Sequence, residues 1–504
     1  MNKATKLLLS SVAAIGVAAS LSSCGADNFN GITITFWHTF GQTVLNGFEE
    51  SAKTFATLVK QNEDVNVRVK FTYKGGYDDV LGEVGRNFSV GGNPTIAVAY
   101  PDHVADYFAS ESYSGEYVVN LEPYANNEEY GFGKESWLGD TAGIEDFVES
   151  FIAESTNYAK DGMYSIPLLK STEVMLYNMD LVAQAMKIID NLPTLPSYDE
   201  VVEFMEDLTW VDFMDFCESV NDHMKEISDT LEIPAVYDSD GNLFITQLFQ
   251  RNIPYAYAGK TENTGVIGFN ASPDNPSPTE EQEKAYGDVV KMLKEYKTWF
   301  NSGYFTTKGV TGEYSSNYFT PGKTMFAIGS CGGSGYSFPS SSEFRVGACK
   351  VPYANNNPTY VSQGPTLTVL HNSKLKAAGT DEDTVLYAWK FIKYITNAEV
   401  NAKQCTVNSE GYIPVRSSAY NTSTFTNFLK SDTDYVVVTK TVVNDIDGRY
   451  FSSPVFKGSA ELRKQCEGCF ADVMKLDKTL SGDSLEEGIK TILNRAIKQS
   501  ILKM

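Results

Sequence analysis

The sequence predicts an α/β protein built from at least two domains. A chain of 504 residues is too long to fold around a single hydrophobic core. Strand-like and helix-like hydrophobic patterns alternate over residues 32–100, which is typical of a parallel or mixed sheet flanked by helices. The alternation starts again near Met163, so we expect a second unit of the same kind.

The first unit begins with a strand, because apolar residues alternate with threonines over 32–36. Apolar residues then recur at helical spacing over 44–59, which predicts an amphipathic helix. Residues 65–73 alternate again and predict a second strand. After the Gly-Gly-Asn-Pro turn at 91–94, residues 95–100 form an apolar run that indicates a short buried strand.

The second unit continues the pattern to the end of the chain, with the prolines at 193 and 196 and a polar loop at 270–279 as its interruptions. The final helix carries a capping-box pattern at its start. In order, we expect strands at 165–167 and 174–177, helices from Tyr198 and over 280–300, a strand at 324–328 followed by a glycine-rich loop at 329–335, a strand at 366–370, a helix at 381–404 and a last helix from Ser484.

The N-terminus has the features of a lipoprotein signal. Two lysines precede an apolar run at 7–19, which is too short to span a bilayer. Residues 21–24 match the lipobox, whose cysteine carries the lipid. We therefore predict a signal peptide at 1–23, lipidation of Cys24 and a tether at 24–31, with an ordinary signal peptide and a chance cysteine as the alternative. Stable anchoring by acyl chains would hold the protein on the cell membrane, facing the extracellular or periplasmic side.

Charge and composition exclude several classes of function. The formal net charge of −23 repels nucleic acid and anionic lipid headgroups, so we expect no nucleic-acid partner. The four histidines form no metal-binding spacing, and we expect neither a metal nor a cofactor. No serine lies in a GxSxG motif, and Asn317 stands where a phosphate-binding loop ending at 322–324 would need glycine. The sequence thus favours a protein that is not an enzyme.

The cysteines other than Cys24 are scattered along the chain. Cys466 and Cys469 form a lone CxxC within an apparent helix that starts near Ala460. A structural zinc site needs four ligands, and a redox CxxC usually opens a helix after a strand. We expect these cysteines to be structural thiols, either buried or paired.

Several short segments together resemble the extracellular solute-binding proteins of ABC importers, in the carbohydrate cluster (family 1) that includes maltose-binding protein. The most specific are 73–77 (YKGGY) and 411–414 (GYIP). Their order and spacing are most similar to those of the sn-glycerol-3-phosphate-binding subunits. The other matching segments are 35–38 (TFWH), 92–94 (GNP), 171–180, 319–334, 363–366 (QGPT) and 459–463 (SAELR).

The resemblance implies a two-lobed fold of the periplasmic-binding-protein type II, in which each lobe is a mixed sheet flanked by helices and the ligand cleft lies between the lobes. It places crossover segments near 167–172, 360–365 and 407–414. The resulting lobes are 32–168 with 364–410 and 169–363 with 411–504. It also implies a monomer that delivers a small-molecule ligand to ABC permease subunits.

The resemblance implies a set of ligand-binding residues as well. An arginine and several neutral donors suit a phosphate group, which accepts charge-assisted hydrogen bonds. Two departures stand out: Asp102 is the carboxylate nearest to the family's glutamate, and Gly241 and Phe244 stand where the relatives have a tryptophan pair. The implied site residues are Tyr77, Asp102, Ser171, Phe244, Ser330, Gly364, Tyr412 and Arg463.

Together these observations predict a lipid-anchored extracellular solute-binding protein. The expected ligand is a small polyol, either glycerol-3-phosphate or a glycerophosphodiester. Because the aromatic floor is changed, a sugar or oligosaccharide is the alternative ligand. A secreted hydrolase or an adhesin that uses the same fold is a more remote alternative.

Overall fold

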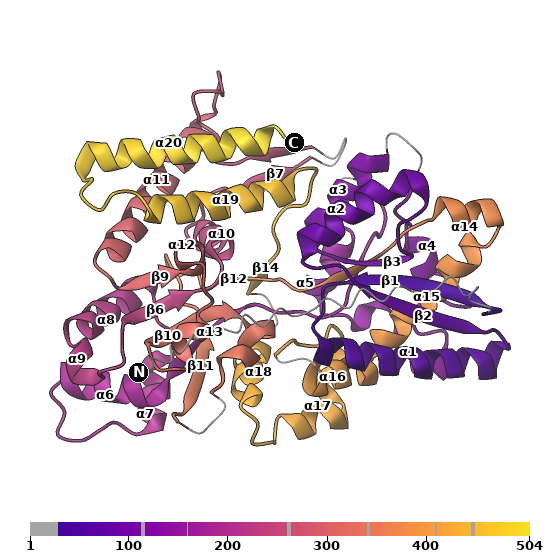
Figure 1. Ribbon diagram of the computed structural model, residues 1–504, viewed down its shortest axis with the longest axis horizontal. Coiled ribbons are helices and arrows are strands. Elements are labelled where there is room, and N and C mark those ends of the chain that lie inside the picture. The colour runs from indigo at the N-terminus through magenta and orange to yellow at the C-terminus, as the bar shows by residue number, and fades with distance from the viewer. Residues whose placement is uncertain are drawn as a thin grey trace, which may run out of the picture.

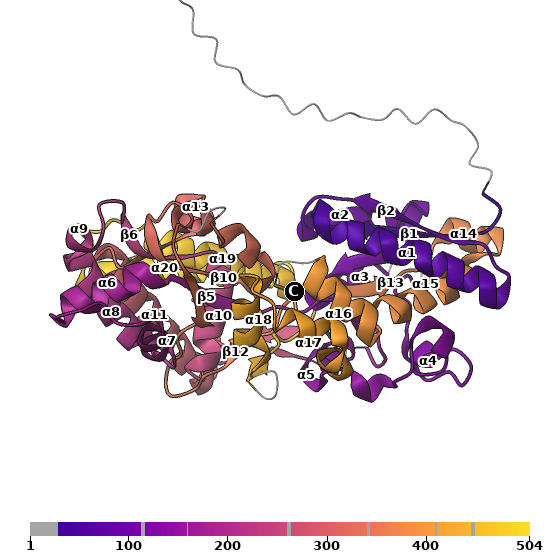
Figure 2. The same ribbon diagram turned by 90° about the horizontal axis from the view of Figure 1, so that it is seen from below.

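The computed structural model describes residues 29–111, 116–158, 160–259, 264–339, 343–408, 411–444 and 449–504. The predicted signal peptide and Cys24 lie outside these residues. Two α/β units lie side by side along the long axis of the molecule, each with a central sheet covered by helices (Figures 1 and 2). The predicted fold class is therefore confirmed. Within the described ranges, every helix is too short or too polar to cross a membrane.

The first sheet is mixed. Its first two strands pair in parallel from Ile32 opposite Val67 to His38 opposite Tyr73. The strand contributed by residues 366–369 runs antiparallel to both of its neighbours. The strand order is β2 (Val67–Tyr73), β1 (Ile32–His38), β3 (Ile96–Ala99), β13 (Thr366–Val369) and β4 (Ile166–Pro167).

Helices from two distant parts of the chain cover this sheet. Phe36 of β1 and Phe391 pack edge to face with ring centroids 6.4 Å apart, and Phe55 packs on Phe391 at 5.2 Å. The predicted helix at 381–404 is two helices, because the Asn397 side chain accepts a hydrogen bond from the Val400 amide and starts a new helix. The helices are α1 (Gln42–Glu63), α2 (Tyr77–Asn87), α3 (Pro101–Glu111), α14 (Ser373–Ala378), α15 (Asp381–Ile395) and α16 (Ala398–Val407).

The second sheet is also mixed. Its strand β5 (Glu173–Asn178) runs antiparallel to both neighbours, whereas β6 (Ile233–Tyr237) runs parallel to both of its own. The full order is β11 (Val346–Lys350), β5, β10 (Thr324–Ser330), β6 and β9 (Phe305–Thr307).

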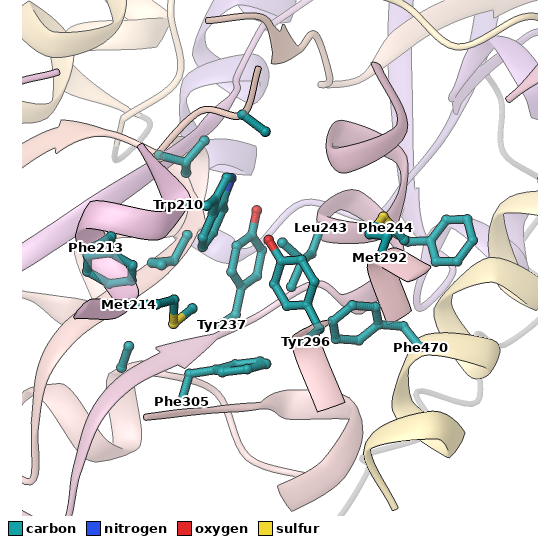
Figure 3. Packing of buried hydrophobic residues seen from close by; sticks show 14 of the residues in the cluster. Trp210, Phe213, Met214, Tyr237, Leu243, Phe244, Met292, Tyr296, Phe305 and Phe470 are labelled. Atoms are coloured by element: carbon teal, nitrogen blue, oxygen red, sulfur yellow. The ribbon is translucent and has the colours of Figure 1, made fainter. Parts of the chain in front are cut away.

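Large aromatic residues fill the core of the second unit (Figure 3). Tyr296 is fully buried and contacts Trp210, Phe305 and Phe470 edge to face, with ring centroids 5.4–5.9 Å apart. Trp210, Tyr296 and Phe470 come from helices, and Phe305 comes from a strand of the sheet. The main helices are α6 (Met179–Ile189), α8 (Trp210–Asp222), α10 (Asp240–Gln250), α11 (Glu280–Asn301), α19 (Ser459–Met474) and α20 (Gly482–Ile501).

The six described cysteines are buried and unpaired. Cys466 and Cys469 lie within α19, as expected of structural thiols.

Short elements complete the fold. The remaining strands are β7 (Ala256–Ala258), β8 (Gly265–Ile267), β12 (Tyr360–Val361) and β14 (Tyr450–Phe451). The remaining α-helices are α4 (Glu122–Ala125), α5 (Glu149–Ile152), α7 (Tyr198–Met205), α9 (Met224–Ile227), α12 (Lys308–Thr311), α13 (Ser316–Phe319), α17 (Ser423–Phe428) and α18 (Tyr435–Val443).

The segments that pass between the two sheets lie side by side. The chain leaves the first sheet after β4 and enters the second at β5, and it returns between β12 and β13. Ser171 and Gln363 exchange two backbone hydrogen bonds of 2.8 and 2.9 Å, and Lys170 and Ile413 exchange two of 3.1 and 2.8 Å. The lobe boundaries expected from the resemblance remain a prediction.

A buried ion pair holds the same region together. Lys170 Nζ lies 2.7 Å from Glu154 Oε2, with the two side chains 1% and 8% exposed. The other Glu154 oxygen accepts hydrogen bonds from the hydroxyls of Ser362 and Ser452 at 2.9 and 2.7 Å. One carboxylate therefore joins three separate segments of chain.

We predict that Lys170→Met lowers the free energy of unfolding by about 3 kcal/mol, because it leaves the Glu154 charge buried without its partner. Chemical denaturation measures the change. The control is Lys323→Met at the exposed Lys323–Glu232 pair, whose atoms are 2.9 Å apart. This control should change stability by less than about 1 kcal/mol. Equal effects of the two variants would contradict a structural role for the buried pair.

Candidate ligand-binding site

A cavity of about 810 Å³ lies between the two α/β units. From the first unit, it is lined by residues at the start of α2 and by the segment that follows β3. From the second unit, it is lined by the start of β5, the end of β10 and the facing sides of α10 and α19. The residues used below are Tyr77, Tyr100, Asp102, Glu173, Asn242, Ser330, Gln363 and Arg463.

Four of the predicted site residues line this cavity: Tyr77, Asp102, Ser330 and Arg463. Tyr77 is the first residue of α2, and Asp102 lies in the first turn of α3. Ser330 ends β10, and Arg463 lies on α19. The first two come from one unit and the last two from the other, so the cavity brings together residues that are distant in the sequence.

Two predicted residues lie directly behind the cavity wall. The Ser171 hydroxyl is 3.4 Å from the Ser330 hydroxyl. Gly364 lines a smaller pocket of about 40 Å³ that shares Asp102 and Arg463 with the main cavity. Gly364 has a φ of +121°, which favours glycine, and a Cβ there would lie 2.3 Å from the Leu169 carbonyl oxygen. A glycine at this position therefore lets the segment at 363–365 approach the segment at 169–170 closely.

Tyr412 also lies behind the wall. A Cβ built on Gly332 would lie 2.7 Å from the Tyr412 ring, so the glycine-rich loop packs closely over this tyrosine. Burial raises the pKa of the Tyr412 hydroxyl, and the neighbouring Tyr100 adds to the shift. Tyr412 is therefore neutral at physiological pH and supports the glycine-rich 3-10 helix (Cys331–Ser337) that follows Ser330.

Phe244 does not lie at the cavity. It is fully buried, with its ring 6.0 Å from that of Phe269. Gly241, three residues earlier on α10, faces α19, where a Cβ would lie 3.2 Å from Glu467 Cβ. Residues three apart share one face of a helix, and the face of α10 that lines the cavity carries Ser239 and Asn242 instead.

Two stacked tyrosines form one wall of the cavity. The rings of Tyr77 and Tyr100 have centroids 4.2 Å apart and an interplanar angle of 29°. Burial raises the pKa of both hydroxyls, so both remain neutral hydrogen-bonding groups at neutral pH. The Arg463 guanidinium carbon lies 5.7 Å from the centre of the Tyr100 ring, across the cavity between the two units.

A buried carboxylate lies at the base of the cavity. Glu173 accepts hydrogen bonds from the Tyr237 hydroxyl and, at 3.0 Å, from Asn242 Nδ2. Burial raises the pKa of Glu173 to about 7, although these two hydrogen bonds and the charge of Arg463 oppose the shift. Asn242 Oδ1 in turn accepts a hydrogen bond from Arg463 Nη2.

Gln363 joins the same network from the passage before β13. Its Oε1 accepts a hydrogen bond from Asn242 Nδ2 at 3.0 Å. Its Nε2 is buried and has no hydrogen-bond partner among the described residues. An unpaired buried donor is costly, and this amide nitrogen remains free to donate a hydrogen bond to an acceptor.

The charged groups of the cavity differ in how far they are already satisfied. Asp238 accepts hydrogen bonds from the backbone and hydroxyl of Ser315 at 2.6 and 3.0 Å, and burial raises its pKa. Asp78 and Glu467 are exposed at the rim. Within the described residues, Arg463 forms no salt bridge. The cavity can therefore offer a guanidinium without a salt-bridge partner among these residues to an anion, and the half-buried Asp102 to a hydroxyl.

One group of side chains in the described ranges has the spacing of a metal site, and it lies outside this cavity. His371 Nδ1 is 2.6 Å from Asp381 Oδ2, with Glu382 nearby. Asp381 also accepts a hydrogen bond of 2.8 Å from the Asn372 backbone. These contacts join β13 to the start of α15.

Sequence reasoning missed Tyr100, Glu173, Asn242 and Gln363. Signals for two of them were present, because Glu173 lies within the matched segment 171–180 and Gln363 begins the segment 363–366. A glutamate or a glutamine alone does not indicate a binding site, because its role depends on its neighbours in the fold. The hydrogen bonds that make them significant join residues 69 to 221 positions apart.

The raised pKa of Glu173 predicts a pH-dependent stability. A carboxyl group with a raised folded-state pKa binds its proton more tightly when folded, so its contribution is present in full below pH 4.5 and is lost as the pH rises through 7. Glu173→Gln, which mimics the protonated form, should therefore stabilise the protein above pH 7, by about 3 kcal/mol as an upper bound. Below pH 4.5 the variant should gain nothing.

Thermal unfolding at pH 4 to 8 measures this difference. Glu128→Gln, at an exposed position, is the control and should follow the parent protein at every pH. A Glu173→Gln variant that loses stability relative to the parent as the pH rises would show that the carboxyl group is not destabilised by burial.

Solved structures share this architecture. The GacH receptor of Streptomyces glaucescens, solved with and without acarbose, aligns with a TM-score of 0.63 at 16% identity, over 93% of this chain and 99% of that one. UgpB of Mycobacterium tuberculosis, in complex with glycerophosphocholine, aligns with a TM-score of 0.61 at 16% identity, over 93% and 98%. At these identities the likeness establishes the fold.

Sequence comparison gives the family. The sn-glycerol-3-phosphate-binding periplasmic proteins UgpB of Shigella dysenteriae and Escherichia coli are 22% identical over 421 residues, which cover 82% of this chain and 81% of those proteins. A family model described as bacterial extracellular solute-binding protein matches residues 52–433, well over half of the chain. The resemblance noted in the sequence is thereby confirmed, and the chain belongs to the bacterial extracellular solute-binding proteins.

Proposed function

We propose that this chain is a lipid-anchored solute-binding component of an ABC importer that captures glycerol-3-phosphate or a glycerophosphodiester, and that it is not an enzyme. The observation that carries the choice of ligand is the Arg463 guanidinium, which faces the cavity without a carboxylate partner among the described residues. A planar guanidinium binds phosphate oxygens with charge-assisted hydrogen bonds. In this proposal the phosphoryl group lies against Arg463.

The remaining polar groups suit the glycerol part of such a ligand. Asp102 is half-buried, and its Oδ1 accepts a hydrogen bond of 3.0 Å from the His103 backbone. Its carboxylate can accept further hydrogen bonds from ligand hydroxyls. Tyr77 and Tyr100 offer aromatic faces to the carbon chain, and Ser330 offers a neutral donor.

The size of the cavity favours ligands larger than a single glycerol phosphate. About 810 Å³ lies towards the upper end of the usual range for small-molecule sites. A glycerophosphodiester would fill more of this volume than glycerol-3-phosphate. Among the structural relatives, the Mycobacterium tuberculosis protein holds a ligand of this class, glycerophosphocholine.

A sugar or oligosaccharide is the second candidate. Carboxylates at Asp78, Asp102 and Glu467, together with stacked tyrosines, also suit a ligand with many hydroxyls. Acarbose binds the Streptomyces glaucescens relative, and maltotriose binds another of the structural neighbours. A sugar ligand would leave the Arg463 charge without a counter-ion, which makes it the weaker candidate.

Capture by this fold requires contacts from both units. Tyr77, Tyr100 and Asp102 lie on one side of the cavity, and Ser330 and Arg463 on the other. A ligand that touches both sides stabilises the closed arrangement by its differential affinity. The passages near 170, 363 and 413 are where a hinge would act, and permease subunits would receive the closed form.

We predict that Arg463→Ala weakens binding of glycerol-3-phosphate by about 2 kcal/mol or more, roughly 30-fold, because a charged hydrogen-bond donor is lost. Isothermal titration calorimetry of the soluble chain from residue 25 onward, with glycerol phosphates, diesters and sugars, measures the effect. The control is Arg495→Ala, since Arg495 is exposed on α20 and pairs with Asp472.

The panel separates the candidate functions. Binding of sugars alone, unchanged by Arg463→Ala, would replace the phosphate ligand with a sugar. Turnover of any compound in the panel would identify an enzyme, and a lack of binding by every compound would favour an adhesin.

The proposed lipid anchor has its own test. In cells, Cys24→Ser should block incorporation of radiolabelled palmitate and release the protein from the membrane fraction, because the lipid is attached through the cysteine thiol. Ser23→Ala, which keeps a small residue before the cysteine, should remain labelled. A Cys24→Ser protein that stays labelled and membrane-bound would rule out lipidation at this position.

A further inference from the structure

Asn242 lies at the centre of a hydrogen-bond network in which the chemistry of the groups fixes which atoms donate and which accept. A guanidinium only donates hydrogen bonds, so the Asn242 atom that faces Arg463 must be the carbonyl oxygen. The amide nitrogen must then face Glu173 Oε1 and Gln363 Oε1, each 3.0 Å away. The buried Glu173 carboxyl group accepts this hydrogen bond from Asn242. It also accepts a hydrogen bond from the Tyr237 hydroxyl.

This fixed amide also orients Gln363. Because Gln363 Oε1 accepts from Asn242, its Nε2 must point the other way, where it has no partner among the described residues. Gln363 is 9% exposed and lines both the main cavity and the small pocket behind it. Arg463 lines the same two spaces. The Gln363 Nε2 group and the Arg463 guanidinium can only donate hydrogen bonds. Both therefore border the same region of the cavity.

We infer that Gln363 is a further ligand contact, and that Glu173 acts through Asn242 as a positioning residue that turns the donors of Gln363 and Arg463 towards an acceptor-only group such as a phosphoryl group. The inference rests on the proposed function, which it deepens. A phosphoryl group supplies only acceptors, so it can satisfy all of these donors at once. A hydroxyl group can both donate and accept hydrogen bonds, so it does not require a wall made of donors alone.

The sharpest test reverses the polarity of the network while keeping its number of carboxyl and amide groups. In the double variant Glu173→Gln/Asn242→Asp, one carboxyl group and one amide exchange places, so a hydrogen bond between the two positions remains possible. The carboxylate introduced on α10 only accepts, however. It would pair with Arg463 and would turn the Gln363 amide around, so that its oxygen faced the cavity. Calorimetry with glycerol-3-phosphate and with inorganic phosphate measures the result.

We expect the double variant to unfold near the temperature of the parent protein and to bind both probes at least about 30-fold more weakly. The conservative variant Glu173→Gln keeps an oxygen facing Asn242 Nδ2, so it should stay within about threefold of the parent. If neither Arg463 nor Gln363 touched the phosphoryl group, the double variant would keep the affinity of Glu173→Gln.

A second variant covers the case in which the double variant does not fold. Gln363→Glu keeps the oxygen that accepts from Asn242 and replaces the NH₂ donor with a carboxylate oxygen. We expect at least about a 30-fold loss of phosphate affinity from the repulsion between like charges. If either folded variant binds phosphate within about threefold of the parent, the inference is wrong.

The two probes separate failure of the inference from failure of the proposed function. If the parent protein and the folded double variant bind glycerol-3-phosphate equally tightly, the inference is wrong and the proposed function still stands. Parent protein that binds inorganic phosphate but no glycerol phosphate or diester, with loss in the double variant, would overturn the proposed ligand and support the subsite. Binding of neither probe would overturn both.

Discussion

The hydrogen bonds between the passages that join the two units are the constraint on which the site depends. Ser171 and Gln363 exchange backbone hydrogen bonds there, and both side chains lie at or directly behind the cavity wall. The buried Lys170–Glu154 pair ties the same passages to the segment that leads into α19 and Arg463. The geometry of these passages and the geometry of the site are therefore set by the same contacts.

Sequence patterns predicted the strands and helices whose apolar residues recur at a regular period or form an uninterrupted run. The strand β1 and the helix α1 emerged because their apolar residues alternate with polar ones at the period of each element. The strand β6 was missed because Pro234 lies within its five residues, and a proline weakens the pattern of a strand. The break between α15 and α16 depends on one capping side chain, Asn397, inside a long helical pattern.

Site residues that lie in a sequence motif could be predicted. Site residues that only the fold brings to the cavity could not. Tyr77 and Arg463 lie in matched segments, and both reach the cavity. Phe244 was placed by alignment alone, and the rotation of α10 turns it into the core instead. Asn242 and Glu173 gain their meaning from contacts 69 residues apart in the chain, and no local pattern records that separation.

The charge of the molecule explains why the site needs this network. A protein with a formal charge of −23 repels anions at long range, although salt screens that repulsion beyond about 10 Å. Attraction must then come from groups that touch the ligand. A carboxyl group beneath such a site would ordinarily oppose it, yet burial raises the pKa of Glu173 to about 7 and so reduces its negative charge near neutral pH. In the proposed function, Glu173 thus orients donors around an anion while contributing less repulsion than a fully ionised carboxylate would add.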